Sequence, residues 1–521
     1  MRGGFIPGGR IHAAAGTARD ATLINCFVQP MAPLRHGRDA LGRTGVEDAL
    51  AEMAHTLRMG GGVGVNLSDL PARKPSEGQP GIDPVSVILR MERNGQQLAT
   101  AGARRAAQMA LLDIHHPDSA AVLDLKRLHR LQTVTLSVCI PDAFMRDVES
   151  DSIEPAAAPG RQSTQASPLA KGKARQLWGR LLQAALDTGN PGIVFVDQVN
   201  RDNNLGELEH LRACNPCGEQ YLPDYGACDL GSINLAHLVR RPFTRAAHVD
   251  LEALCQLAHV AVRALDNVIE LTRWPLEQQA REAHRTRRVG LGVTGLADAL
   301  IMLGLRYDRQ AGRDAAAAML RTLRNAAYLS SVQLAIERGA FPLFDAEQLL
   351  SPPHAASRLP RFIQRRIARH GLRNSHLTAI APAGTISLAM ADNVSSGIEP
   401  VFAPQALRRI AMPDNTVIVR TVDDHALRSL RALRPSATGL PQAWCDVSTL
   451  QAMDHLRMVA ALQPLVDAGI SKTIHLRSTT SVEELDRLLR SAWRSGLKGV
   501  SVFRVGTSQE AVLCDARRST G

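Results

Sequence analysis

Short apolar runs that favour β-strands alternate along this chain with longer segments of helical periodicity. The runs at residues 134–140, 192–196 and 377–381 contain β-branched residues and end after a few positions. Segments 251–271 and 311–338 instead repeat apolar residues every three or four positions, which is the pattern of an amphipathic helix. Because strands that alternate with helices become covered by them, the sequence predicts an α/β fold with a largely buried sheet or barrel.

Length and composition set the broad class of protein. The 521 residues, of which 45% are hydrophobic, are enough for a large buried core. No stretch approaches about 18 uninterrupted apolar residues, and residues 1–10 are glycine-rich without the apolar run of a secretory signal. We therefore expect no transmembrane helix and a cytoplasmic location. The eight cysteines show no regular spacing, so a disulfide scaffold is not expected.

The formal net charge of +11 raises the question of nucleic-acid binding. Arginine supplies most of the positive charge, and its densest run, at residues 358–373, is typical of a solvated helix face. Four tyrosines and four tryptophans provide few platforms on which bases could stack. A stable nucleic-acid partner is therefore not expected.

Residues 149–175 differ in composition from the rest of the chain. They are rich in Ala, Ser, Pro and Gln and lack apolar periodicity. This composition predicts a disordered surface insertion.

Two cysteines, Cys214 and Cys217, have the C-x-x-C spacing of zinc ligands and of thioredoxin-like redox pairs. A zinc site would lack its fourth ligand, because no second C-x-x-C follows and His210 and His237 are poorly spaced. A thioredoxin-like motif opens a helix after a strand, whereas residues 216–218 indicate a tight loop. Buried structural thiols are the simplest remaining interpretation.

The neighbours of Cys217 favour a chemical role over a structural one. An amide and a carboxylate flank it two positions away on either side. In an extended loop, side chains two apart point the same way, so Asn215, Cys217 and Glu219 would share one face. A thiol, a hydrogen-bonding amide and a general base would then converge on one small substrate.

These residues lie in a segment, NPCGEQ at 215–220 followed by CDLGSINL at 228–235, that is similar to the finger loop of class II ribonucleotide reductases. Further segments resemble the same family in the expected order, so that the resemblance covers residues 20–510. They are NCFV (25–28), GGGVGVN (60–66), PGIVFVD (191–197), RRVGLGVTG (287–295), APAGTIS (381–387), SGIEP (396–400), SKTI (471–474) and GVSVFR (499–504).

The resemblance implies a fold: a ten-stranded α/β barrel of the ribonucleotide reductase and glycyl-radical type, with a central finger loop near residues 213–228. Residues 1–148 would form the first part of the barrel and residues 176–510 the remainder. The predicted insertion at 149–175 would separate them, and residues 511–521 would form a short tail.

The resemblance also implies an activity: reduction of ribonucleotides, expected to be diphosphates, to 2′-deoxyribonucleotides for DNA synthesis by a thiyl-radical mechanism. Cys217 would be the transient thiyl that takes the 3′-hydrogen, Glu219 the general base for the 3′-hydroxyl, and Asn215 a hydrogen-bonding partner of the sugar. Cys26 would protonate the leaving 2′-hydroxyl. Cys26 and Cys228 would then close a disulfide, which requires Cα atoms about 5.5 Å apart.

Two glycine-containing segments are expected to hold the nucleotide. Residues 60–64 are not a P-loop, since no Lys-Ser/Thr follows, but glycine lets the backbone approach a ligand closely. At 382–387, the family's usual Pro-Thr-Gly-Thr-Ile-Ser becomes Pro-Ala-Gly-Thr-Ile-Ser, whose backbone N–H groups and hydroxyls suit phosphate oxygens. The implied substrate contacts are Asn25, Gly61, Gly62, Asn215, Pro216, Gly218, Pro382, Ala383, Gly384, Thr385 and Ile386.

Three other features have ordinary interpretations. The GLGVTG segment at 290–295 fits the dinucleotide fingerprint, but a polar segment rather than a strand precedes it. The pair at 115–116, two histidines, lacks a third metal ligand and fits a capping or solvated role, so no metal site is predicted. Cys139 and Cys255 have apolar neighbours and are expected to pack inside the fold.

The radical source is expected to be adenosylcobalamin. Relatives that depend on a partner subunit pass the radical through a tandem tyrosine pair near the C-terminus, and residues 500–504 contain no tyrosine. Reducing electrons would come from an external dithiol such as thioredoxin, and the resemblance leaves room for a homodimer.

Two departures from the family define the alternative hypotheses. Cys26 lies almost at the start, so no ATP-binding cone is expected ahead of it, and Cys514 lacks the C-x-x-C partner with which relatives re-reduce their disulfide. The main alternative is therefore a catalytically inactive or specialised nucleotide-binding paralogue. A subunit-dependent reductase and a nucleic-acid-binding protein are the others.

Overall fold

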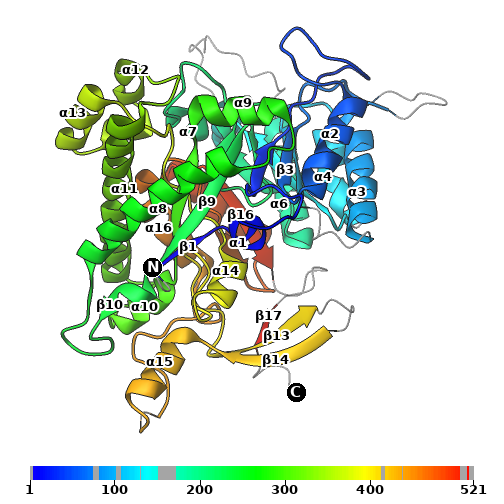
Figure 1. The fold of residues 1–521 in the computed structure, drawn as a ribbon. Helices are drawn as coiled ribbons and strands as arrows, with labels where there is room; N and C mark the ends of the chain where they lie inside the picture. The colour runs from blue at the N-terminus through cyan, green and yellow to red at the C-terminus, as the bar shows by residue number, and fades with distance from the viewer. Residues whose placement is uncertain are drawn as a thin grey trace, which may run out of the picture.

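A central sheet of ten strands organises the molecule (Figure 1). The computed structural model describes residues 4–73, 81–100, 107–129, 131–150, 172–411, 417–436, 438–504 and 513–515. The strands of the central sheet are β1 (Phe5–Pro7), β2 (Cys26–Val28), β3 (Gly62–Asn66), β4 (Gln108–Asp113), β5 (Val134–Ile140), β6 (Gly192–Phe195), β9 (Ala227–Asn234), β12 (Val289–Thr294), β15 (Thr473–Leu476) and β16 (Gly499–Arg504).

The sheet consists of two parallel halves joined by antiparallel pairs. Strands β2 to β6 run parallel in chain order, and the second half contains the parallel pairs β9–β12 and β15–β16. β2 meets β9 antiparallel, and β6 meets β16 antiparallel. Such a sheet, with helices around it, buries its strands on both faces. All eight residues of β9 are accordingly buried.

Residues 377–381 close the ring between β12 and β15. Thr378 bridges Leu291 of β12, and Ile380 bridges Ile470 just before β15, both in parallel. We expected a regular strand here, and the segment forms isolated bridges instead. The reason is that the N–H groups of Leu377 and Thr378 donate to the carboxylate of Asp467 rather than to a strand. β1 pairs only with residues 231–233 of β9, so the ring consists of the other nine strands with this segment as its tenth member. The pairings then close, and the predicted α/β barrel is confirmed.

Helices surround the barrel, and Figure 1 shows α8 and α11 on one side of it and α2, α3 and α4 on the other. The helices are α1 (Gly9–Ala14), α2 (Val46–Arg58), α3 (Pro84–Thr100), α4 (Ser119–His129), α5 (Asp142–Ser150), α6 (Lys173–Thr188), α7 (Val196–Arg201), α8 (Leu251–Leu271), α9 (Glu277–Thr286), α10 (Leu296–Met302), α11 (Gln310–Arg338), α12 (Ala346–Leu350), α13 (Arg361–His370), α14 (Gly384–Ala389), α15 (His425–Leu433), α16 (Ala452–Leu462) and α17 (Val482–Arg494).

Local sequence accounts for the best-predicted elements. α8 begins where Asp250 accepts a hydrogen bond from the N–H of Ala253, and its apolar stripe of Leu254, Ala258 and Leu265 is buried. The helix therefore has the bounds that its periodicity predicts. β5 likewise coincides with the predicted run at 134–140.

The predicted insertion at 149–175 is only partly described. Its ends are helical, because α5 extends to Ser150 and α6 starts at Lys173, and residues 151–171 lie outside the described residues. A small sheet joins β13 (Gln405–Ala411), β14 (Val417–Asp423) and β17 (Leu513–Asp515), so part of the expected tail pairs with the body of the protein. Residues 511–512 and 516–521 of the expected tail, and residues 505–510 before it, lie outside the described residues.

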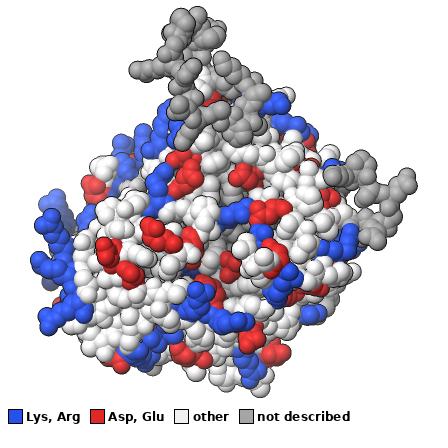
Figure 2. All heavy atoms as spheres, turned by 90° about the horizontal axis from the view of Figure 1, so that it is seen from above, with Lys and Arg blue, Asp and Glu red and all other residues white. Residues whose placement is uncertain are grey.

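The surface seen in Figure 2 mixes charges of both signs, with Lys and Arg gathered at one edge rather than in a stripe across the face. Several arginines there and elsewhere form ion pairs, as Arg180 does with Asp124 and Arg212 with Asp69. This face offers no continuous basic groove for nucleic acid. Among the described residues, no helix combines the length and apolarity needed to cross a bilayer.

The finger loop starts from a short hairpin inside the barrel, β7 (Ala213–Cys214) with β8 (Tyr221–Leu222). The carbonyl of Cys214 lies against Gly64 of β3, where an added Cβ would come within 1.7 Å of the oxygen. A side chain at this position would push the hairpin away from the strand. The glycine thus fixes the height of the loop over β3.

We expect Gly64→Ala to lower the free energy of unfolding by about 1–3 kcal/mol, the usual cost of overpacking a core. Gly179→Ala is the matched control, because a Cβ at Gly179 in α6 meets nothing within 4 Å. The control should leave stability unchanged or raise it by up to about 1 kcal/mol, because alanine is the better helix former. Urea unfolding measures both variants, and equal effects would contradict the proposed contact.

Candidate active site

A cavity of about 320 Å³ opens where the finger loop, β2, β9 and the start of α14 meet. Its size suits a nucleotide-sized ligand. It is lined by Gly8, Gly9, Arg10, Asn25, Cys26, Leu57, Gly60, Gly61, Gly62, Ala107, Asn215, Pro216, Cys217, Glu219, Leu230, Gly231, Ser232, Ala381, Pro382, Ala383, Gly384, Thr385 and Ile386.

Cys26 and Cys228 lie directly opposite each other in the antiparallel pair β2–β9. Opposed residues in such a pair have Cα atoms about 4.5–5.5 Å apart, a separation that a disulfide can bridge. Both cysteines are buried and both are free thiols in this structure. The fold therefore places side by side two cysteines that are about two hundred residues apart in sequence.

The finger loop turns tightly at its tip. The N–H of Gly218, which has φ +77°, donates to the carbonyl of Asn215 at 3.0 Å. Our premise of an extended loop is therefore wrong, and its alternation rule does not apply. The turn nevertheless brings the three side chains together, because Asn215, Cys217 and Glu219 all line the cavity. The glycine is needed here because the left-handed backbone suits residues without a Cβ.

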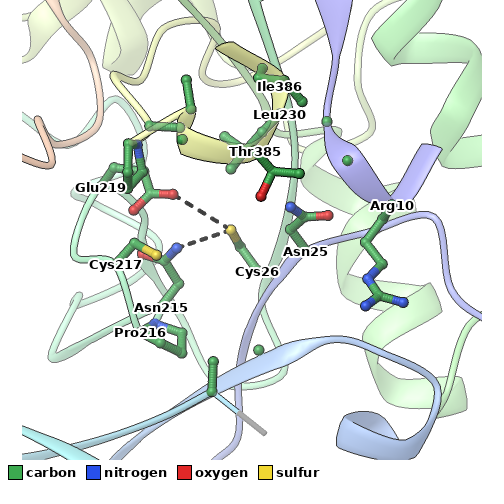
Figure 3. A pocket seen from close by; sticks show the side chains of 18 of the residues that line it. Arg10, Asn25, Cys26, Asn215, Pro216, Cys217, Glu219, Leu230, Thr385 and Ile386 are labelled. Carbon is green, nitrogen blue, oxygen red and sulfur yellow. Dashed lines mark hydrogen bonds between the residues drawn. The ribbon is translucent and has the colours of Figure 1, made fainter. Parts of the chain in front are cut away.

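Asn215 and Glu219 both contact the thiol of Cys26 (Figure 3). Asn215 Nδ2 donates to Cys26 Sγ at 3.0 Å, and Cys26 Sγ lies 3.9 Å from Glu219 Oε1. The amide orientation is fixed, since Asn215 Oδ1 accepts from the N–H of Gln220 at 3.0 Å. The thiol is thus held between an amide donor and a carboxyl acceptor.

Glu219 is a buried acid with one unused oxygen. Its side chain is 1% exposed, and Oε2 has no hydrogen-bond partner. Burial raises the pKa of Glu219 to about 7, opposed by hydrogen bonds from its own backbone, Asn215 and Cys26. A carboxyl with this pKa can accept a proton near neutral pH, as a general base must.

The two facing thiols stay protonated. Burial raises the pKa of Cys26 well above its usual value, and the nearby Glu219 raises it further. Burial likewise raises the pKa of Cys228 well above its usual value, with Asp229 as the next cause. A protonated thiol can donate a proton, which suits the expected role of Cys26.

Cys217 differs from the other thiols of the site because it is exposed. It lies at the tip of the turn, and the space beside Gly218 is open, with no atom within 4 Å of a Cβ built there. The thiol can therefore be approached by a large group from outside as well as by a ligand in the cavity.

The expected nucleotide contacts are mostly where the sequence predicts them. Asn25 lines the cavity, and its carbonyl accepts the N–H of Gly62 at 2.8 Å. The turn at 382–386 lines the opposite wall. Two residues predicted to contact the nucleotide lie elsewhere. Gly218 shapes the turn and does not line the cavity, and the hydroxyl of Ser387 is buried against that of Thr294 at 2.5 Å. Thr385 keeps its hydroxyl in the cavity wall.

The sequence analysis missed one wall of the cavity. Gly8, Gly9 and Arg10 enter it from the N-terminal segment, and Ser232 enters it from β9. A signal was present in the sequence, because two glycines beside an arginine allow the backbone to approach a ligand closely next to a cationic side chain. Their distance from the finger loop in sequence hid the connection.

Other features have structural roles. The ring of His116 is buried and accepts the N–H of Asp118, just before α4, at 3.0 Å. Cys139 packs in the core, and Cys255 lies half-buried on α8, as expected. Gly290 and Gly292 lie within β12, and only Gly295 follows it, at the start of α10. The first two glycines are therefore not in a turn after a strand, and the segment does not form a dinucleotide-binding turn.

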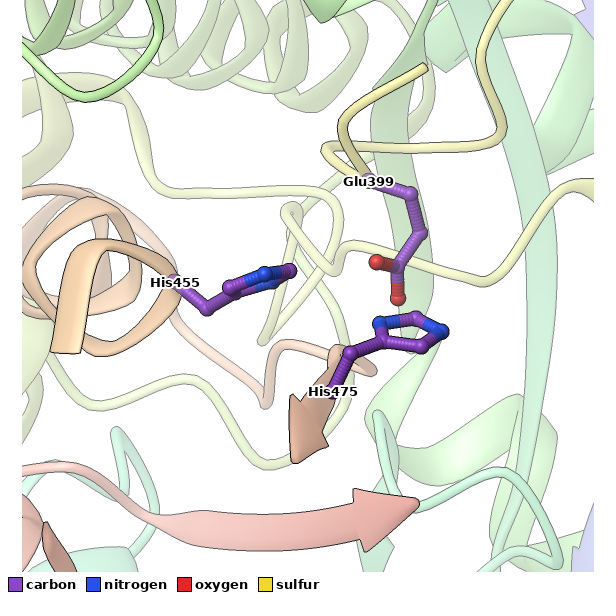
Figure 4. A group of neighbouring side chains, drawn as sticks. All are labelled: Glu399, His455 and His475. Carbon is purple, nitrogen blue, oxygen red and sulfur yellow. The ribbon is translucent and has the colours of Figure 1, made fainter. Parts of the chain in front are cut away.

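One cluster outside the cavity has the residue types of a metal site (Figure 4). Glu399, His455 and His475 present ligand atoms within 4.8 Å of one another. Lys472 lies against two of the three, however: its ammonium contacts the Glu399 carboxylate and lies 2.7 Å from His455 Nδ1. Because an ammonium already supplies the positive charge beside Glu399 and His455, we assign no metal centre to this cluster.

The chain matches one family and several known proteins. A sequence model of the family described as ribonucleotide reductase, barrel domain, matches residues 24–503. A vitamin B12-dependent ribonucleoside-diphosphate reductase of Mycobacterium tuberculosis (strain CDC 1551 / Oshkosh) is 34% identical over 98% of this chain and 72% of its own length. A protein of the same name from Thermoplasma acidophilum is 28% identical over 98% of this chain and 64% of its own length.

A solved structure shares the fold. The Actinobacillus ureae class Id ribonucleotide reductase alpha subunit superposes with a TM-score of 0.70, covering 97% of this chain and 88% of its own. The two sequences are 19% identical, so this likeness concerns the fold alone.

We expect mild oxidation with diamide to join Cys26 to Cys228, because the two face each other across one antiparallel pair. The reaction should be slow at neutral pH and faster in alkali, because both thiols have raised pKa values. Peptide mapping under non-reducing conditions identifies the bridge, and Cys228→Ser should abolish it. A bridge between Cys214 and Cys217 alone would refute the pairing.

Proposed function

The chain belongs to the ribonucleotide reductase family, and from this premise we propose that it is a vitamin B12-dependent enzyme reducing ribonucleoside diphosphates to 2′-deoxyribonucleotides. One observation carries the proposal. Asn215, Cys217 and Glu219 converge with Cys26 on a single cavity, and Cys228 faces Cys26. The presence of this complete set argues against a catalytically inactive paralogue.

The reaction exchanges two thiols for one disulfide. The ribonucleotide loses its 2′-oxygen as water, and the two electrons come from Cys26 and Cys228, which become a disulfide. Cleavage of the unactivated carbon–oxygen bond becomes feasible once a radical resides at the neighbouring C3′. Cys217 is the group proposed to take the 3′-hydrogen and to return it afterwards, and its exposed thiol at the loop tip supports this role.

Protons move through the buried groups. Glu219 accepts the 3′-hydroxyl proton at its unused Oε2, and a pKa of about 7 suits that transfer. Cys26 gives its proton to the leaving 2′-hydroxyl, for which a thiol held protonated by burial is well prepared. Asn215 orients the thiol and is available to the sugar.

Adenosylcobalamin is the cofactor of this reaction, and when bound it supplies a radical by homolysis of its cobalt–carbon bond. The residues of the site fit such a group. Cys217 is exposed and the space beside Gly218 is open, so a large planar molecule can reach the thiol. The tip of the finger loop at 216–218 would face it. β15 and β16 contain no tyrosine that could carry a radical from another subunit.

The partners follow from the chemistry. A ribonucleotide is the substrate, and a reductant must reopen the disulfide after each turnover. We propose a thioredoxin-like dithiol for this step, a cytoplasmic location where such dithiols are kept reduced, and a homodimeric assembly.

Deoxynucleotide formation should require adenosylcobalamin and should be abolished by Cys217→Ser. A serine hydroxyl holds its hydrogen much more strongly, so the variant should fold and bind nucleotide without reducing it. The assay is anaerobic conversion of ribonucleoside diphosphates with dithiothreitol, with and without adenosylcobalamin. Cys255→Ser, on the outer helix α8, is the control and should keep full activity.

A further arm separates radical chemistry from reduction. Cys228→Ser keeps the radical step but lacks one reducing thiol, so it should consume substrate and release free base. Activity without cobalamin in the presence of a small metal-containing subunit would overturn the assignment of the cofactor.

The logarithm of kcat/KM should rise with pH up to about 7 and then level off, because Glu219 acts as a base only when ionised. Its pKa is raised from the ordinary value, so the active carboxylate is lost as pH falls below about 7, earlier than for an exposed glutamate. Glu219→Gln should lower kcat by about 10²–10⁴-fold, the usual contribution of a general base, and remove this limb. An unchanged pH profile in the variant would assign the limb to another group.

A further inference from the structure

Arg10 has a distinctive place among the described residues that line the cavity. It carries the one Lys or Arg side chain in that lining, and Glu219 carries the one carboxyl. The two charged groups lie apart, because Figure 3 shows Asn25 and Thr385 between Arg10 and the thiols. The cavity is therefore polarised, with a proton-accepting end and a cationic end.

The fold makes room for the Arg10 side chain. A Cβ built on Gly60 would lie 2.1 Å from Arg10 Nη1, so a side chain at position 60 would displace the guanidinium. The start of the segment is also anchored, since the N–H of Gly8 donates to the carbonyl of Leu230 at 2.8 Å. The space above Gly60 and the anchored backbone at Gly8 together place the Arg10 guanidinium at the cavity wall.

A structural role for Arg10 is the competing explanation. Gly60 follows the end of α2, where the helix dipole favours a positive charge. A guanidinium that only stabilised this helix end would act on folding and would not distinguish one cavity ligand from another. The two explanations therefore differ in how ligand charge affects binding.

The negative charge of the substrate determines how it is oriented between the Glu219 end and the Arg10 end of the cavity. A ribonucleoside diphosphate brings several negative charges, and a buried anion needs a cation or several N–H donors. Guanidinium groups bind phosphate in a forked geometry with charge-assisted hydrogen bonds. The sugar must lie near Cys26 and Glu219 for the proposed chemistry. This leaves the phosphates to extend toward the wall formed by Thr385 and Arg10.

We propose that Arg10 binds the phosphate group farthest from the sugar and thereby sets the preference for a nucleoside diphosphate over the monophosphate and the free nucleoside. This inference rests on the proposed function and deepens it. The 382–386 turn then holds the phosphate nearer the sugar through its backbone, and Arg10 supplies the charge that the turn lacks.

The test is equilibrium binding by calorimetry of cytidine, CMP and CDP to the full chain without cofactor or reductant, so that no turnover occurs. Wild-type affinity should increase from cytidine to CDP. Arg10→Gln should weaken CDP binding by about 10- to 100-fold, the worth of a hydrogen bond to a charged group, and leave cytidine binding within about 2-fold. Arg10→Lys should recover part of the loss, because it restores the charge without the fork.

Two further variants sharpen the experiment. Arg58→Gln removes an exposed charge at the C-terminal end of α2, outside the cavity. This variant should bind all three ligands as the wild type does. Gly60→Ala should reproduce the selective loss of CDP binding, because it displaces the guanidinium without removing it. Thermal unfolding of each variant checks that it is folded.

The outcomes are distinct. An equal loss for all three ligands in Arg10→Gln, or no loss, overturns the role of Arg10 while the proposed function stands. A wild-type chain that binds none of the three ligands overturns the proposed function and this inference with it. A loss that is largest for CDP, smaller for CMP and within about 2-fold for cytidine supports both.

Discussion

The antiparallel pairing of β2 with β9 is the contact on which the rest of the site depends. It is one of two junctions between the parallel halves of the barrel, and it sets Cys26 directly against Cys228. From this junction the sheet continues through parallel neighbours, β3 to β6 on the side of β2 and β12 on the side of β9. A slip of one residue in the β2–β9 register would turn one thiol to the opposite face of the sheet. The finger loop then needs only to reach this one position, and Gly64 fixes the height at which it does so.

Burial at this junction does two things at once. The low-dielectric interior keeps the thiols protonated, and it raises the pKa of Glu219 to about 7. In water the carboxylate would be a poor base at neutral pH because its pKa is too low, and the thiols would ionise more readily. One physical cause, removal of solvent from a small volume, thus prepares a proton donor and a proton acceptor within 3.9 Å of each other.

Sequence reasoning succeeded where the cause is local or carried by a motif. The helix at 251–271 and the strand at 134–140 follow from periodicity over one segment, and the residues of the finger loop follow from a dense motif. It failed where the cause is a long-range contact. Residues 377–381 have strand-like composition, yet the carboxylate of Asp467 takes two of their N–H groups. Arg10 escaped notice because only the closed barrel brings it to the cavity.

The extended-loop premise shows how a correct set of residues can rest on the wrong geometry. Alternation in an extended chain predicts that Asn215, Cys217 and Glu219 point the same way, whereas in the turn Cys217 is exposed and its two neighbours are buried. The difference matters chemically. If the Cys217 thiol were as buried as Asn215 and Glu219, it would be shielded from any large group outside the cavity. The turn instead gives Cys217 access to both sides, to the cavity on one side and to open space beside Gly218 on the other. A residue that must exchange a hydrogen atom with the substrate and also be reached by a bulky cofactor has to occupy such a boundary.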